Sequence, residues 1–326
     1  MRGIGARLAR LGLFAALAAA VQNGASSCAA PSPDSTAAPK TYADSIQAWR
    51  DARVKRLTSD TGWLTVAGLY WLSPGENAFG TDSSNAIVLP AGSAPARAGS
   101  FRLERVGDRE RVVVRAEPGT EIRPAGGAGA AGAAHSVTER ALVADDAGSP
   151  DTVRVGRLTF IAIKRGERLA IRMRDTESTM RKGFKGIDFY PIDPSHRVEA
   201  RFEPFDPPRK IPVLNIAGYA DSMAAPGRLR FTVDGVSCTL TPVHEEPSDT
   251  LLFIIFSDQT TEVETYGGGR CFYANPPRDG RVVLDFNKAY NPPCAFTPFT
   301  TCPLPPEGND LPVAVRAGER KYTGHD

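Results

Sequence analysis

Short runs in which apolar and polar residues alternate, or in which apolar residues follow one another, cover most of the chain after residue 61. The clearest runs are Leu158–Ile163, Leu169–Arg174, Leu229–Val233, Val236–Leu240 and Leu251–Phe256. Two pairs of them are joined by glycine-containing turn sequences, Arg165-Gly166-Glu167 and Asp234-Gly235. Glycine supplies the positive φ of a tight hairpin turn, so both pairs predict β-hairpins. The pattern predicts an all-β protein.

A helical period occurs once, in residues 41–60. Ile46, Trp49 and Leu57 recur at helical spacing, with Arg and Lys residues expected on the opposite face. Thr41 with Asp44 three positions later forms a capping-box sequence. We therefore expect one amphipathic helix ahead of the strands.

The strand-like runs fall into two groups. We expect a first β lobe with a hinge in residues 61–190 and a second β lobe in residues 191–320, each built like a sandwich or barrel. The segment 175–198 between them interleaves basic and aromatic residues. Net charge is +2 and no wider basic stripe is present, so we do not expect nucleic acid as a partner.

The segment Pro74–Pro90 resembles the opening of a forkhead-associated (FHA) β-sandwich. That family binds phosphothreonine through an Arg that follows the glycine, whereas Gly80 here is followed by Thr81. Without this Arg the bidentate contact to phosphate is lost. The resemblance implies an FHA-like shape for the first lobe and does not imply phosphopeptide binding.

The N-terminus has the pattern of an export signal. Arg2, Arg7 and Arg10 precede the apolar run Leu11–Val21, and small residues lead to Cys28. The junction resembles a bacterial lipobox, which predicts a signal peptide in residues 1–27, acylation of Cys28 and a flexible tether in residues 28–40. The protein would then be a cell-envelope lipoprotein that faces the periplasm or the cell exterior. The alternative is ordinary cleavage near residue 25, with Cys28 an unmodified thiol.

The richest chemistry lies between residues 265 and 305. Two strand-like runs, Cys271–Asn275 and Arg281–Phe286, predict a hairpin across a Pro-Pro-Arg-Asp-Gly loop. Antiparallel pairing would bring polar, charged and aromatic side chains together, which suits a small polar or anionic ligand. The expected ligand-binding residues are Arg270, Tyr273, Asp285, Asn287, Lys288, Tyr290 and Asn291.

Two other interpretations of this stretch stay open. Arg270 and Asp285 could pair with each other, and the Asn side chains could bond turn backbone. Alternatively, the protein could be a metal-independent hydrolase or lyase with Asp285 as base and Arg270 and Lys288 stabilising an oxyanion. No paired Cys or His with zinc spacing and no nucleotide-binding glycine loop occurs in the sequence. We expect no metal and no cofactor, and whether the protein is an enzyme stays open.

The cysteines suggest one disulfide. Cys294 and Cys302 bracket a short proline-rich segment, and export would place them in an oxidising compartment. Closing so short a loop would contribute about 2–3 kcal/mol in the chain-entropy model. Cys238 and Cys271 are either free thiols or a second bridge. A nucleophilic Cys294 with a His partner is a further possibility.

Four blocks of sequence carry a family resemblance. The blocks Gly62–Gly80, Phe184–Pro194, Glu264–Arg270 and Asp285–Pro298 resemble the DUF1684 family, and they span most of the chain from about residue 49 to residue 319. DUF1684 is a domain of unknown function, so the resemblance assigns no catalytic residue.

Overall fold

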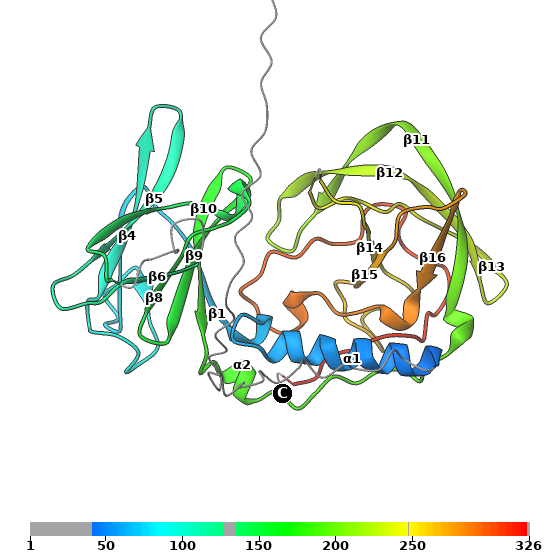
Figure 1. Cartoon of the computed structure of the whole chain (residues 1–326), viewed down its shortest axis with the longest axis horizontal. Coiled ribbons are helices and arrows are strands. Elements are labelled where there is room, and N and C mark those ends of the chain that lie inside the picture. Colours follow the sequence, from blue (N-terminus) through cyan, green and yellow to red (C-terminus); the bar gives the residue numbers. More distant parts are fainter. Residues whose placement is uncertain (1–40, 127–134, 247, 325–326) are drawn as a thin grey trace, which may run out of the picture. The chain divides into compact units, whose positions relative to one another are not determined.

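The computed structural model describes residues 41–126, 135–246 and 248–324. These residues belong to one unit, Pro39–Asp326. Strands dominate, as Figure 1 shows, and the prediction of an all-β fold is confirmed. The predicted signal peptide, the tether and Cys28 lie outside the described residues. No helix in the described ranges is long and apolar enough to cross a membrane.

Helix α1 (Tyr42–Thr58) begins at the predicted capping box. The Asp44 amide donates to Thr41 Oγ1 at 3.1 Å, and the Thr41 amide donates to Asp44 Oδ2 at 3.0 Å. The expected division into an apolar face and a basic face is wrong, because Arg50 and Arg53 lie on the buried face with Ile46 and Leu57. Burial of an arginine is tolerated where its guanidinium finds a hydrogen-bond acceptor. The Nη2 atom of Arg50 donates to Tyr190 O at 2.8 Å, which satisfies one of its buried donors.

Two five-stranded sheets form the first group of strands. One has the order β1-β10-β9-β8-β6 and the other β3-β2-β4-β5-β7. Phe79 and Phe101 of the second sheet pack on Phe160 of the first, and their ring centroids lie 5.7 and 5.5 Å from the Phe160 centroid. A shared aromatic core between two sheets makes this group a β-sandwich. The strands are β1 (Val66–Trp71), β2 (Gly75–Gly80), β3 (Ile87–Val88), β4 (Gly99–Val106), β5 (Arg109–Ala116), β6 (Arg123–Gly126), β7 (Glu139–Leu142), β8 (Thr152–Val155), β9 (Leu158–Arg165) and β10 (Arg168–Asp175).

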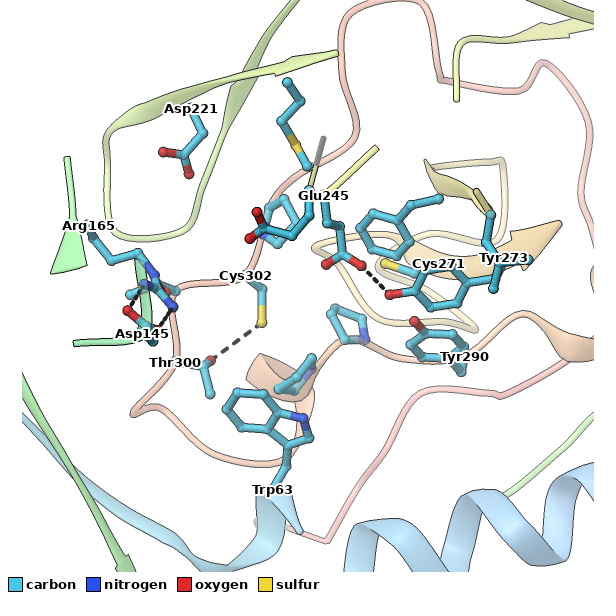
Figure 2. Close-up of a pocket in the computed structure, with 18 of the residues that line it drawn as sticks. Trp63, Asp145, Arg165, Asp221, Glu245, Cys271, Tyr273, Tyr290, Thr300 and Cys302 are labelled. Atoms are coloured by element: carbon cyan, nitrogen blue, oxygen red, sulfur yellow. Dashed lines mark hydrogen bonds and ion pairs between the residues drawn. The ribbon is translucent and has the colours of Figure 1, made fainter. Parts of the chain in front are cut away.

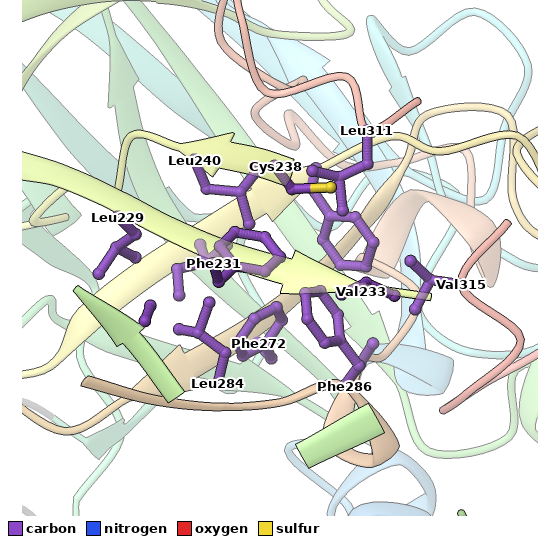
Figure 3. Close-up of a cluster of buried hydrophobic side chains, with 14 of the residues drawn as sticks. Leu229, Phe231, Val233, Cys238, Leu240, Phe272, Leu284, Phe286, Leu311 and Val315 are labelled. Atoms are coloured by element: carbon purple, nitrogen blue, oxygen red, sulfur yellow. The ribbon is translucent and has the colours of Figure 1, made fainter. Parts of the chain in front are cut away.

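The second group of strands surrounds its own core. A four-stranded sheet has the order β13-β12-β11-β16, and β14 pairs with β15. Phe286 lies 5.1 Å from Phe272 and 5.8 Å from Phe231 between ring centroids, and Figure 3 shows these side chains together. The strands are β11 (Arg197–Leu214), β12 (Ala220–Val233), β13 (Val236–Leu240), β14 (Leu252–Phe256), β15 (Arg270–Ala274) and β16 (Arg281–Asp285). Short helical turns are η1 (Trp63–Thr65), η2 (Asp145–Ala147), α2 (Thr179–Lys182), η3 (Pro194–His196), η4 (Phe286–Lys288) and η5 (Pro293–Ala295).

Two predicted hairpins are confirmed and one is wrong. β9 pairs with β10, and β12 pairs with β13 across Asp234 and Gly235, whose φ values are 50° and 79°. β15 and β16 do not pair with each other: β15 pairs with β14, and β16 pairs with β11. Pairing with β14 buries Phe272 of β15 in the second core, so long-range packing sets the partner of this strand.

Candidate functional site

A cavity of about 950 Å³ is lined by residues from both groups of strands. Its walls come from α1, η1, the β9–β10 turn, β12, β14, β15 and the segment 288–303. Figure 2 shows Trp63 pointing into it, with the Asp145–Arg165 ion pair and the Glu245–Tyr273 hydrogen bond on opposite walls. The volume lies within the range of small-molecule sites.

One wall contains a buried arginine that forms no hydrogen bond or ion pair with the described residues through its guanidinium. Arg172 on β10 is 7% exposed and lines the cavity. Within the described residues its guanidinium makes no hydrogen bond or ion pair, and Nε is buried. The guanidinium carbon lies 5.2 Å from the Trp63 ring centroid. Burial, followed by the nearby charge of Arg165, lowers the pKa of Arg172 to about 10.

The neighbouring arginines have hydrogen-bond partners. Arg165 forms a bidentate ion pair with Asp145, at 2.9 and 2.8 Å, and donates through Nε to Thr301 Oγ1 at 3.2 Å. Arg174 donates to Gly62 O at 2.6 Å. Among the arginines of the described chain that are less than a tenth exposed, Arg172 alone has no hydrogen bond. The four are Arg50, Arg53, Arg172 and Arg270.

The facing wall carries a carboxylate among aromatic rings. The Tyr273 hydroxyl donates to Glu245 Oε2, and the Tyr273 ring stacks on Phe253 at 4.9 Å between centroids. Tyr273 reaches this wall because side chains alternate along β15, where Phe272 faces the core. Burial, with added repulsion from Asp249 and Glu246, raises the pKa of Glu245.

Helix α1 supports the same wall from below. The Arg53 guanidinium carbon lies 4.7 Å from the Tyr290 ring centroid, its Nε donates to Glu319 Oε1 at 2.9 Å and its Nη2 donates to Asn291 O at 2.8 Å. The Glu319 side chain is fully buried. Arg53 therefore fixes the Tyr290 ring against both the helix and the C-terminal segment.

The ligand-binding residues predicted from sequence do not all lie at one site. Tyr273, Tyr290 and Lys288 line the large cavity. Arg270 lines neither cavity: it is 1% exposed, pairs with Asp258 at 2.6 Å and donates to Val315 O at 2.8 Å. The alternative pairing of Arg270 with Asp285 is wrong.

The first residue of α1, Tyr42, forms hydrogen bonds with Asp285 and Asn287, and Lys288 lies beside Asp285. Tyr42 donates its hydroxyl hydrogen to Asp285 Oδ1 at 2.7 Å, and Asn287 Nδ2 donates to the Tyr42 oxygen at 3.0 Å. Lys288 Nζ lies 3.8 Å from Asp285 Oδ2. With neighbouring residues, Asp285 and Lys288 line a second cavity of about 510 Å³.

The side chains of Asn287 and Asn291 mainly donate hydrogen bonds to backbone carbonyl groups. Asn287 Nδ2 also donates to Asp193 O at 2.7 Å, and Asn291 Nδ2 donates to Arg320 O at 2.7 Å. Arg270 is engaged elsewhere, so the structure does not assemble Asp285, Lys288 and Arg270 as the set that the hydrolase hypothesis requires.

Arg172, Trp63 and Glu245 were not predicted from sequence. One signal was available on β10: Leu169, Ile171 and Met173 alternate with other residues, which puts Arg172 and Arg174 together on the other face. An arginine in mid-strand, flanked by apolar residues, indicates either a buried pair or a ligand site.

The cysteines of the described chain are free thiols. Cys294 and Cys302 are nevertheless adjacent, because the Cys294 amide donates to Cys302 Sγ at 3.2 Å. A hydrogen bond from the Cys302 thiol lowers the pKa of Cys294. Buried Cys271, on the cavity wall, has its pKa raised by burial.

In the described ranges no cluster of three or more His, Cys, Asp or Glu side chains is arranged to hold a metal ion.

Comparisons with known proteins point to a family without an assigned activity. No curated protein matches the chain. The solution NMR structure of an uncharacterized protein from Haloarcula marismortui is 37% identical, covers 43% of this chain and 78% of its own, and has a TM-score of 0.37. Residues 182–320 match the family described as "Protein of unknown function (DUF1684)". Over residues 182–320, the chain is therefore similar to the DUF1684 family.

Proposed function

We propose that this protein binds a small anionic ligand in the 950 Å³ cavity, and that it does so as an exported, lipid-anchored protein of the cell envelope. The observation that carries the binding proposal is Arg172, a guanidinium that is 7% exposed, lines the cavity and makes no hydrogen bond or ion pair with the described residues. A buried charge without an ion pair is costly to the fold, so its position in the cavity wall favours a role in binding.

The chemistry of the wall suits an anion. A guanidinium offers five donors in a planar fork, and its bonds to carboxylate or phosphate are charge-assisted. The Trp63 ring beside Arg172 excludes water from one side of this contact. Arg165 is already neutralised by Asp145, so a ligand anion would compensate Arg172 alone.

Titration with inorganic phosphate and with acetate, at constant ionic strength, tests the proposal. Either anion should raise the melting temperature of the wild type by mass action. Arg172→Gln should abolish this shift. Arg168→Gln is the matched control, because Arg168 is on the same strand, is exposed and stacks on Trp71 rather than Trp63. Equal shifts in wild type and Arg172→Gln would contradict the proposal.

The envelope part of the proposal is supported by the N-terminal sequence. A basic segment, the apolar run Leu11–Val21 and a lipobox-like approach to Cys28 support export followed by acylation. Full-length protein should partition into detergent, and Cys28→Ser should release it to the soluble fraction. Identical partitioning of the two proteins would refute the anchor.

We also propose a disulfide between Cys294 and Cys302 in that oxidising compartment. The support is proximity, since Cys302 Sγ already accepts a hydrogen bond from the Cys294 amide. Thiol–disulfide exchange with a disulfide donor would form the S–S bond, and the two electrons and two protons lost by Cys294 and Cys302 would pass to the donor, which becomes its dithiol.

A further inference from the structure

The large cavity contains uncompensated charge of both signs. Arg172 is the positive member. Among the other cationic side chains in the wall, Arg53 pairs with Glu319 and Lys288 with Asp285. Arg56 has no ion pair among the described residues, but it is exposed, whereas Arg172 is buried. On the negative side Asp145 is paired with Arg165. Three other carboxylates of the wall, Asp221, Glu245 and Glu246, have no ion pair within the described residues, and of these Glu245 accepts the Tyr273 hydrogen bond beside the aromatic rings.

Glu245 is placed to receive a cation. Its carboxylate accepts one hydrogen bond from the Tyr273 hydroxyl and lies near two other carboxylates, Glu246 and Asp249. The stacked rings of Tyr273 and Phe253 stand in the same wall. A carboxylate beside aromatic faces is the arrangement that recognises ammonium groups, because both the charge and the ring quadrupole attract a cation.

We infer that the ligand is zwitterionic, with its anionic group on Arg172 and an ammonium group on the Glu245–Tyr273 wall. This rests on the proposed function for the Arg172 end and adds a second, independent contact at the other end. Glu245 is exposed, so water or a ligand hydroxyl can complete its hydrogen bonding, but only a cation pairs with its charge. An ammonium group satisfies both requirements.

Matched pairs of probes test this inference. The pairs are glycine and acetate, γ-aminobutyrate and butyrate, ε-aminocaproate and caproate, and O-phosphoethanolamine and ethyl phosphate. Each pair shares its anionic group and differs by an ammonium group, and the series varies the separation between the charges. Affinity is measured by isothermal titration calorimetry on the full-length protein.

In at least one pair the amine-bearing member should bind wild type about tenfold more tightly than its partner. Glu245→Gln should bring this ratio close to one while the matched anion binds as before. Arg172→Gln should weaken both members. Glu246→Gln is the control, because it makes the same change of charge in the same wall without the Tyr273 contact, and it should keep most of the ratio.

The outcomes separate the two proposals. If the matched anions bind through Arg172 but no amine adds affinity at any length, the zwitterion inference fails and the anion site stands. A preference for amines that survives Glu245→Gln, or is lost equally in Glu246→Gln, also overturns the Glu245 assignment. If no probe of either kind binds, both proposals fail.

Discussion

Replacing Arg172 with methionine should make the ligand-free protein more stable. Burial lowers the pKa of Arg172 from 12.5 to about 10. Because one pKa unit corresponds to about 1.4 kcal/mol, the fold disfavours the charged guanidinium by about 3 kcal/mol. Methionine removes this penalty and also the contact with Trp63, which contributes about 1–2 kcal/mol. The expected net gain in the free energy of unfolding is about 1–2 kcal/mol, in line with other buried charges replaced by apolar groups.

Urea denaturation followed by tryptophan fluorescence measures this gain as a higher midpoint with an unchanged m-value. The control, Arg168→Met, removes an exposed guanidinium that lies 4.1 Å from the Trp71 ring centroid, and should lower stability by up to about 1 kcal/mol. The two variants therefore differ in sign although both lose an arginine–tryptophan contact from β10. A loss of stability in Arg172→Met as large as in the control would refute the claim that Arg172 is uncompensated.

Three further predictions follow from other groups. Arg270→Ala should lower the free energy of unfolding by about 3–5 kcal/mol, because Asp258 is left buried and unpaired; retained stability with lost anion binding would contradict this. Peptide mapping without reduction should find Cys294 linked to Cys302 in exported protein, and rapid alkylation of both thiols in the native state would exclude the link. The pKa of Glu245 is raised in the fold, so its ionised form destabilises the protein above that pKa. Glu245→Gln should therefore be more stable than wild type at neutral pH, and the difference in melting temperature should decrease as pH falls through the folded pKa and vanish below the unfolded pKa of the carboxyl.

Local signals in the sequence predicted much of the fold. The Asp234-Gly235 turn and the Thr41–Asp44 capping box each depend on residues a few positions apart, and both formed as expected. The hairpin between β15 and β16 failed because strand partners are chosen by the whole core. β15 instead pairs with β14, which buries Phe272 against the central aromatic cluster.

The candidate site was less accessible to sequence reasoning. Tyr273, Lys288 and Tyr290 were expected at a ligand site and do line the large cavity. Arg172 and Glu245, the two charged side chains on which the binding proposals rest, are 73 residues apart, and nothing local indicates that β10 and the segment before β14 line the same cavity. Their meeting depends on the arrangement of both groups of strands, which no short-range pattern encodes.

Three buried arginines show what separates a structural role from a binding role in this protein. Arg53 and Arg270 each bond a buried carboxylate and backbone carbonyls, Glu319 for the first and Asp258 for the second. Both therefore hold the C-terminal segment against the rest of the chain, and their removal should cost stability. Arg172 is equally buried but has neither kind of bond. Because the described residues give this charge no hydrogen bond and no ion pair, and the Trp63 contact offsets only part of the burial penalty, the interaction that balances this charge is best supplied from the cavity.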